Sequence, residues 1–313
     1  MTPKVSAIIP TFRRPKLLPR ALESVLAQTW RPLELVVIDD GSGDDTPKVL
    51  ADFAPRAKAA GVEFKHFTVA NGGPGLARNA GMQQATGELF AFLDDDDAWL
   101  PEKLAAQVPL LLTRAGAGLC FTQYTHVGSD AAKPAPESMR DGWCFETLCD
   151  GRTRAHLQTL LVRRAVTEKL GGFLPLFNFE DTEFCLRASL EFEFVALPRP
   201  FTVIHGAPDT VSRDRGLEGD LKRDMLKLRV LHEFSLTYSA HSRYSAPALK
   251  AYRARIHDEH VKHLLWLGRV RQAREAYESA IEDCGPLPLF EGLRGKIRKA
   301  RVLGWFGLRL KKP

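Results

Sequence analysis

Short hydrophobic runs alternate with helical periodicity over the first hundred residues. Apolar residues recur at the three- and four-residue spacing of an amphipathic helix, most clearly over residues 16–29. The runs between such segments predict four strands, at residues 5–9, 35–38, 62–68 and 89–93. Strands that alternate with helices are typical of βαβ units. We therefore expect an α/β fold with a mostly parallel sheet and helices on both faces.

The pattern becomes less regular beyond residue 100. A helix is predicted near residues 101–114, and Gly, Pro, Ser and charged residues over 128–142 indicate a loop. The remaining hydrophobic runs predict strands at residues 119–127, 157–162, 194–197 and 201–204, and a helix ending near Leu190.

From about residue 217 the hydrophobic pattern is helical, with a helix pair that turns at Gly268. We therefore expect an α/β domain at residues 1–216 and a basic helical C-terminal extension at residues 217–313. Charge supports this division, because the first part has 24 basic and 27 acidic residues and the second has 20 and 11.

The composition is that of an ordinary soluble protein, with 44% hydrophobic and 26% charged residues. We find no run of about eighteen apolar residues that could span a bilayer, and no signal-peptide pattern. The five cysteines are scattered, which favours reduced thiols over disulfides or a zinc site. We expect a cytoplasmic protein.

Polar side chains follow three of the predicted strands, at the point where each strand ends. Thr11 follows the first strand, Asp39-Asp40 the second, and Asp94–Asp97 the fourth. The carboxyl ends of parallel strands meet at one edge of a sheet, where ligands of open α/β sheets bind. We expect these side chains to line one cleft.

The four consecutive carboxylates Asp94–Asp97 end a buried hydrophobic strand. Side by side they repel one another and lose hydration when buried, so stability alone does not account for them. A divalent cation resolves the conflict, because Mg²⁺ and Mn²⁺ prefer hard oxygen ligands. The alternative is a solvated acidic turn before a helix that starts near Pro101.

Six short motifs, in this order and spacing, resemble those of the family 2 glycosyltransferases. They are Val5–Phe12, Val37–Ser42, Gly73–Gly81, Leu93–Asp97, Gly172-Phe173 and Glu180-Asp181. The resemblance extends over residues 4–210. It implies a GT-A fold and an inverting, metal-dependent transfer of a sugar from a nucleoside-diphosphate sugar. A UDP-sugar is the first expectation, with a hydroxyl of a glycan, glycolipid or other acceptor as the target.

The resemblance also implies a nucleotide-sugar site, made of Pro10, Thr11, Phe12, Asp39, Asp40, Gly73, Arg78, Asp94 and Asp95. Asp40 would accept a hydrogen bond from the nucleobase, and Arg78 would contact phosphate or base. The alternatives are turn chemistry at Asp39-Asp40 and a surface arginine on an amphipathic helix.

Asp94 and Asp96 match the family's D-x-D element, which implies Mn²⁺ or Mg²⁺ as the cofactor. Asp94 would meet the ribose, and Asp96 the metal. Because four acids adjoin, the register could slip to Asp95 and Asp97. Some relatives place a histidine at the position of His205, which implies a further metal ligand. A structural or exposed histidine is the alternative.

Asp181 matches the family's catalytic base, and Glu180 is the second candidate. Inversion needs a carboxylate on the acceptor side to take the hydroxyl proton. The alternative for Asp181 is an N-cap for a helix at residues 182–190. The Gln-x-x-Arg-Trp element of processive synthases is absent, which favours single additions.

Two rival functions remain open. A nucleotidyltransferase that makes a sugar nucleotide would need a glycine-rich loop after the first strand, but residues 10–15 contain no glycine. A non-catalytic sugar-nucleotide-binding protein would not need Asp96 and Asp181.

The end of the chain is strongly basic. Residues 294–312 carry eight basic residues and no acidic one, with aromatic and leucine residues between them. We expect this tail to contact the inner face of the cell membrane rather than nucleic acid. The alternative is a solvated helix packed on its own domain.

Overall fold

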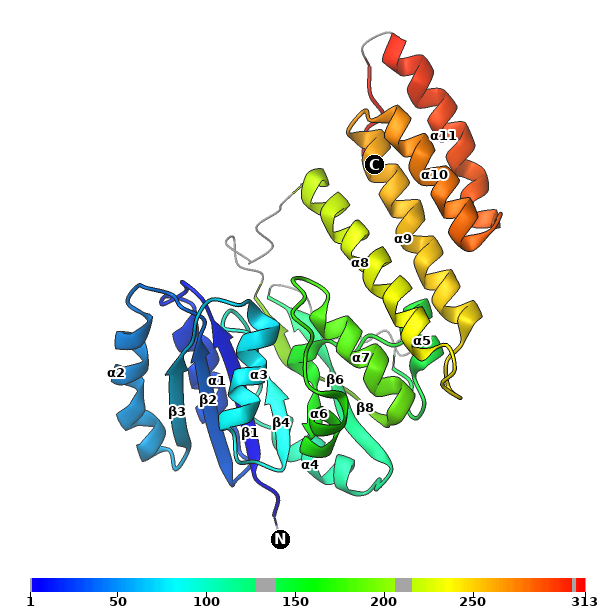
Figure 1. Cartoon of the computed structure of the whole chain (residues 1–313). Coiled ribbons are helices and arrows are strands. Elements are labelled where there is room, and N and C mark those ends of the chain that lie inside the picture. Colours follow the sequence, from blue (N-terminus) through cyan, green and yellow to red (C-terminus); the bar gives the residue numbers. More distant parts are fainter. Residues whose placement is uncertain (1, 128–138, 206–215, 306–307, 313) are drawn as a thin grey trace. The chain divides into compact units, whose positions relative to one another are not determined.

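A computed structural model describes residues 2–127, 139–205, 216–305 and 308–312, so most of the predicted loop 128–142 lies outside the described residues. The chain forms two compact units, Met1–Asp209 and Thr210–Pro313. Figure 1 shows a sheet with helices in the first unit and helices in the second. The three clusters of buried hydrophobic residues each belong to a single unit.

Four strands form the parallel half of one eight-stranded sheet. They are β1 (Val5–Thr11), β2 (Leu33–Asp39), β3 (Glu63–Thr68) and β4 (Leu89–Phe92). β1 lies between β2 and β4, β3 pairs with β2, and all three pairings are parallel. The helices between them are α1 (Leu18–Leu26), α2 (Thr46–Ala59) and α3 (Pro74–Gln84). The strand and helix order predicted for this half is confirmed.

The other half of the sheet mixes directions. β7 (Leu161–Arg163) is antiparallel to both β4 and β6 (Ala117–His126), whereas β8 (Glu193–Ile204) is parallel to β6. The short β5 (Ala98–Trp99) closes this edge, antiparallel to β8. The strand order is β3-β2-β1-β4-β7-β6-β8-β5.

Successive residues of the central strands enter two different cores. Ala7 and Ile9 of β1 belong to the core under α1, α2 and α4 (Lys103–Leu112). Ile8 belongs to the core under α3, α6 (Arg164–Leu170) and α7 (Glu180–Glu191). The short α5 (Phe145–Asp150) packs at this second core, and Figure 1 shows α3 and α7 in front of the sheet. Helices therefore cover both faces, as predicted.

The strand predicted at residues 157–162 is wrong in its first half, because Leu157–Thr159 is a 3₁₀ turn. The carbonyl of Gln158 accepts hydrogen bonds from Trp99 (2.8 Å) and Thr202 (3.1 Å), so side chains replace a strand ladder here.

The two strands predicted at 194–197 and 201–204 are one strand, β8, whose pairing register with β6 shifts between them. The prolines at 198 and 200 lack the N–H that a regular ladder needs, and the shift accommodates them.

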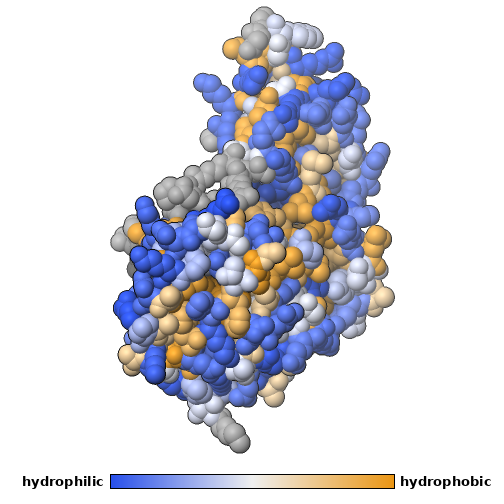
Figure 2. Space-filling model, turned by 60° about the vertical axis from the view of Figure 1, so that its left-hand side comes forward, coloured by the Kyte–Doolittle hydropathy of each residue, from blue (hydrophilic) through white to orange (hydrophobic). Residues whose placement is uncertain are grey.

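The second unit consists of α8 (Leu217–Tyr238), α9 (Ala246–Trp266), α10 (Val270–Cys284) and α11 (Pro288–Trp305). Gly268 has a φ of +77° in the short link between α9 and α10, where the sequence predicts the turn. No helix among the described residues is both long and apolar enough to cross a membrane. Hydrophilic residues cover much of the surface visible in Figure 2.

Candidate active site

Three strand ends of the first unit meet at one edge of the sheet. Thr11 at the end of β1 lies opposite Asp39 at the end of β2. Asp94–Asp97 follow β4, the other parallel neighbour of β1. Pro10 and Phe12 flank Thr11, so the residues predicted from these three motifs share one region.

Asp40 holds the loop before α3. Its carboxylate accepts hydrogen bonds from the backbone N–H groups of Gly72 (2.8 Å) and Gly73 (2.9 Å) and from the side chain of Asn71 (3.0 Å). Asp39 binds more locally, through the N–H of Ser42 at 2.9 Å. A carboxylate has about four acceptor positions, so Asp40 keeps about one for another donor.

Arg78 of α3 joins two sides of the region. One guanidinium nitrogen donates to Asp94 at 2.7 Å, and another donates to Glu180 at 2.9 Å. The residue is only 4% exposed, so the alternative of a surface arginine is wrong. Arg78 therefore links the end of β4 to the start of α7.

Small residues let the chain before α7 dock closely on α3. A Cβ at Gly75 would lie 3.0 Å from the carbonyl oxygen of Leu174, and one at Gly172 would lie 2.5 Å from Oδ1 of Asn79. The Asn79 amide donates to the carbonyl of Phe173 and accepts from its N–H, both at 2.8 Å. The Gly172-Phe173 motif thus fixes this segment against α3.

Asp95 and Asp96 share a cation that the sequence interpretation did not assign. Arg14, in the loop after β1, donates to Asp95 at 2.8 Å and to Asp96 at 2.9 Å, and Thr11 donates to Asp95 at 2.7 Å. All four side chains are buried. Two adjacent arginines beside a polar strand end were the available signal. Asp95 therefore faces the β1 loop.

Asp94 and Asp97 have other partners. The side-chain amide of Gln158 donates to Asp94, and the backbone N–H of His205 donates to Asp97 at 2.9 Å. Gln158 was also missed, because nothing in the local pattern around it marks a ligand. The imidazole Nδ1 of His205 lies 3.1 Å from the carbonyl of Val203.

Three of these carboxylates gather as a metal site would require. Asp94, Asp96 and Asp97 each offer an oxygen, and these oxygens lie within 4.8 Å of one another. Burial, and then the charge of Asp94, raise the pKa of Asp97 to about 7 and also raise that of Asp96. Hard oxygen donors that repel one another suit Mg²⁺ or Mn²⁺. The predicted pair Asp94 and Asp96 is in this group, whereas the imidazole of His205 is not.

The start of α7 separates the two candidate bases. The N-cap of α7 is Phe179, and Asp181 is the second helical residue, so the N-cap alternative for Asp181 is wrong. Glu180 is 5% exposed and bound to Arg78, and burial raises its pKa although Arg78 opposes this. Asp181 is half-buried and accepts from the N–H of Thr182 at 2.6 Å.

A cluster of rings lies close to Asp181. The His156 and Tyr124 rings meet edge to face with centroids 4.4 Å apart, and Tyr124 meets His126 at 5.5 Å. Burial lowers the pKa of His156, and the Asp181 charge opposes this. Amphipathic rings of this kind suit a sugar, and sequence reasoning missed them because they come from separate segments.

A second grouping with metal-ligand chemistry lies in the second unit, at His257, Asp283 and Cys284. Here Arg253 forms an ion pair with Asp283, and His257 lies 3.0 Å from the same carboxylate. This group contains a single carboxylate, which a guanidinium already neutralises, whereas three mutually repelling carboxylates meet in the first group. We therefore interpret the second group as a structural ion pair between α9 and α10.

Solved glycosyltransferases share this fold. The mannosyltransferase PcManGT of Pyrobaculum calidifontis, solved with GDP-Man and Mn²⁺, matches with a TM-score of 0.62 and 18% identity over 98% of this chain and 88% of that one. Residues 1–349 of Staphylococcus aureus TarS, solved with UDP-GlcNAc, match with a TM-score of 0.58 and 19% identity over 93% and 92%. The predicted GT-A fold is confirmed.

The sequence itself identifies the family. The model of glycosyl transferase family 2 matches residues 6–169, more than half of the chain. The chain therefore belongs to glycosyl transferase family 2, as its motifs predict.

Curated relatives agree with this membership. An uncharacterized glycosyltransferase of Nostoc sp., alr2836, is 41% identical over 188 residues, 55% of each chain. The GalNAc(5)-diNAcBac-PP-undecaprenol beta-1,3-glucosyltransferase of Campylobacter jejuni is 38% identical over 127 residues, 40% of this chain and 37% of the relative. The matched region thus spans about half, or less, of the length of these relatives.

Proposed function

We propose that the chain is an inverting, non-processive glycosyltransferase that moves a sugar from a nucleoside-diphosphate sugar to a hydroxyl of a glycan or glycolipid. The observation that carries this proposal is the group of Asp94, Asp96 and Asp97 at the carboxyl edge of the sheet, joined by Arg78 to α7. It gives a donor side and an acceptor side within one site.

The donor would bind along the ends of β1, β2 and β4. The acceptor position left on Asp40 suits an imide N–H of a nucleobase, and Asp94 suits ribose hydroxyls. The solved relatives contain UDP-GlcNAc or GDP-Man. We take a UDP-sugar as the first donor to test and GDP-sugars as the second.

Asp94 and Asp96 would hold Mn²⁺ or Mg²⁺, with Asp97 beside them and His205 as the next neighbour. The ion would neutralise the negative charge that grows on the leaving diphosphate. Arg14 supports this role because it fixes Asp96 in place.

On the other side of the site, Asp181 would take the proton of the attacking hydroxyl. Its carboxylate is half-buried, whereas Glu180 is already bound to Arg78. Tyr124, His126 and His156 would offer ring faces and imidazole nitrogens to the acceptor sugar.

A thermal-shift screen of nucleotides and sugar nucleotides, with and without Mn²⁺, tests the proposal first. UDP or GDP should raise the melting temperature more with Mn²⁺ than without it. Transfer or slow hydrolysis of the stabilising donor should follow. Formation of a sugar nucleotide from a nucleoside triphosphate and a sugar phosphate would favour the nucleotidyltransferase instead. Binding without any turnover would favour the non-catalytic protein.

The basic segment 294–312 would contact an anionic membrane surface, as the sequence predicts, at the cytoplasmic side where sugar nucleotides are available. Its positive charge supports this role. Binding to anionic vesicles that does not weaken as salt concentration rises would count against it.

A further inference from the structure

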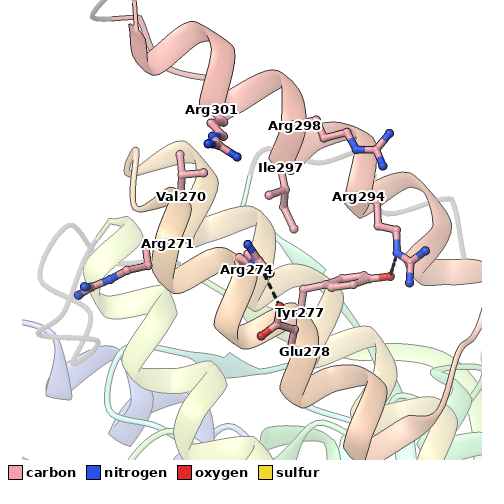
Figure 3. Close-up of a pocket in the computed structure, with 9 residues that line it drawn as sticks. All are labelled: Val270, Arg271, Arg274, Tyr277, Glu278, Arg294, Ile297, Arg298 and Arg301. Atoms are coloured by element: carbon pink, nitrogen blue, oxygen red, sulfur yellow. Dashed lines mark hydrogen bonds and ion pairs between the residues drawn. The ribbon is translucent and has the colours of Figure 1, made fainter.

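A groove of about 760 Å³ lies between α10 and α11 in the second unit. Its lining residues combine cationic and apolar side chains, and they are Val270, Arg271, Arg274, Tyr277, Glu278, Arg294, Ile297, Arg298 and Arg301. Figure 3 shows Ile297 and Arg301 pointing from α11 toward α10. All of these lining residues belong to the second unit, whereas the candidate active site belongs to the first.

Positive charge dominates this groove, with five arginines against one glutamate. On α10, Arg274 donates to Glu278 at 2.9 Å, so part of the charge is already neutralised. On α11 the acidic residue is Glu291 in the first turn, and residues 292–305 contain five basic residues and no acidic one. Among the described residues, no carboxylate forms an ion pair with Arg298 or Arg301. Like charges remain on one wall of the groove.

Tyr277, Val270 and Ile297 give the groove an apolar base. Tyr277 is 9% exposed, and its hydroxyl accepts a hydrogen bond from Nε of Arg294 at 2.7 Å. Val270 and Ile297 add aliphatic surface on the two sides. Arg294 is thereby fixed at the rim, so the groove combines a held guanidinium with two others that lack an acidic partner.

Apolar side chains are also exposed at the end of α11. Val302 is 47% exposed and Trp305 is 73% exposed, and the guanidinium of Arg301 lies 5.9 Å from the centroid of the Trp305 ring. Exposed aromatic and aliphatic residues next to arginines are typical of helices that meet amphiphiles. A purely ionic ligand would leave these apolar groups unused.

We propose that the groove between α10 and α11 binds the phosphate or diphosphate group of an anionic amphiphile. Guanidinium groups donate pairs of hydrogen bonds to phosphate oxygens, and an anion between the helices relieves the repulsion among the arginines of α11. The guanidinium groups would recognise a phosphate in the same way on a lipid headgroup or on a soluble phosphate compound, but only a lipid would also use the exposed apolar side chains. The two probes below distinguish these sources. This site is additional to the donor site and does not depend on sugar transfer.

The full chain with Arg298→Gln and Arg301→Gln tests the proposal. The matched control is Lys296→Gln with Lys299→Gln, which removes the same charge from the same helix at exposed positions that do not line the groove. Pyrophosphate binding is measured by calorimetry with EDTA, and vesicle binding by sedimentation with phosphatidylglycerol or phosphatidylcholine vesicles. A third variant, Arg298→Lys with Arg301→Lys, keeps the charge and loses the paired donors.

The arginine-to-glutamine variant should lose affinity by about tenfold or more, and the lysine control should stay within about twofold of the wild type. Loss for pyrophosphate alone assigns a soluble phosphate compound, and loss for phosphatidylglycerol vesicles alone assigns a lipid headgroup. Equal losses in the arginine-to-glutamine variant and in the control Lys296→Gln with Lys299→Gln would reduce the effect to net charge and overturn the proposal. It would also be overturned by equal binding to phosphatidylcholine vesicles, or by no binding of either phosphate probe to the wild type.

Discussion

Glu180 and Asp181 are neighbours in sequence but have opposite surroundings. Glu180 is buried and bound to Arg78, which also holds Asp94. Asp181 is half-buried, and its Oδ1 accepts hydrogen bonds from the N–H and the hydroxyl of the adjacent Thr182. Glu180 therefore has the contacts of a positioning residue, and Asp181 has an oxygen available to a substrate. Substitutions at these two positions should have different consequences.

Asp181→Asn should lower transfer by about 10² to 10⁴-fold, the usual contribution of a positioned proton acceptor. The amide keeps an oxygen for the N–H of Thr182, so the melting temperature and the donor affinity should change little. Steady-state transfer, donor binding and thermal unfolding measure the three effects. Transfer within a few-fold of the wild type would move the base elsewhere.

Glu180→Gln is the matched comparison and should behave differently. It leaves Arg78 buried with half of its ion pairs, a change that typically costs about 3–5 kcal/mol of folding free energy. Donor affinity should fall too, because Arg78 also orients Asp94. Chemical unfolding and donor binding check this. An unchanged stability together with a large loss of transfer would instead identify Glu180 as the base.

Asp96→Asn should remove the Mn²⁺-dependent part of nucleotide binding, because a neutral amide is a poor ligand for a hard cation. Without metal the variant should lose little stability, because removing one of three mutually repelling carboxylates offsets the lost ion pair with Arg14, which keeps Asp95. Melting curves with EDTA and across a Mn²⁺ titration show both effects. A wild-type response to Mn²⁺ would contradict the metal role of Asp96.

The acidic residues of the site could be predicted from sequence because they follow hydrophobic strands directly. Their partners could not. Arg14 and Asp95 are 81 positions apart, and Gln158 and Asp94 are 64 apart, so no local pattern joins them. Consecutive acidic residues in a sequence indicate that cations must lie nearby in the fold, but they do not indicate which cations.

At the scale of elements, prediction worked where strands alternate with helices. The parallel half of the sheet has regular hydrophobic runs, and α7 is marked by its acidic start. The start of β7 and the continuity of β8 were not predicted, because side-chain hydrogen bonds replace a ladder before β7 and prolines shift the pairing register of β8. The 3₁₀ turn before β7 carries Gln158 and follows His156, which explains why this side of the site was the less predictable one.

Glu34 ties together the strands of the parallel half. It lies fully buried in β2 and accepts hydrogen bonds from Ser6 of β1, Lys65 of β3 (2.6 Å) and the N–H of Thr86 (2.8 Å). Burial alone would raise the pKa of Glu34, but these partners lower it from 4.5 to about 2. The ionised form is therefore favoured in the folded protein.

This lowered pKa predicts a pH dependence of stability. The stabilisation by Glu34 is fully present above the unfolded-state pKa and is lost as the pH falls from about 4.5 to about 2. Its size is about 3 kcal/mol, from about 1.4 kcal/mol per pKa unit. Glu34→Gln should be less stable than the wild type at pH 7, and the difference should shrink over that acid range. Urea unfolding at several pH values measures it, and a constant difference would argue against the assignment.

The whole molecule has separate cores. The core of the second unit includes Phe290, Leu293 and Ala300 of α11, so the predicted basic tail is partly an integral helix. A deletion of residues 294–313 would cut through this helix and confuse loss of folding with loss of binding. The charge substitutions on α11 avoid that ambiguity. The predicted domain boundary at residue 216 stays a prediction, next to a division of the compact units at Asp209 and Thr210.

Separate cores predict separate unfolding. Because each hydrophobic cluster belongs to one unit, calorimetry of the full chain should show two transitions. A ligand stabilises only the unit that binds it, by about 2.7 kcal/mol at 100 times its Kd. UDP with Mn²⁺ should therefore raise the transition of the first unit, and pyrophosphate with EDTA should raise that of the second. Asp96→Asn should abolish the first shift and keep the second, whereas Arg298→Gln with Arg301→Gln should do the reverse. A single transition that moves as a whole with either ligand would mean that the two units fold as one, and would contradict the prediction.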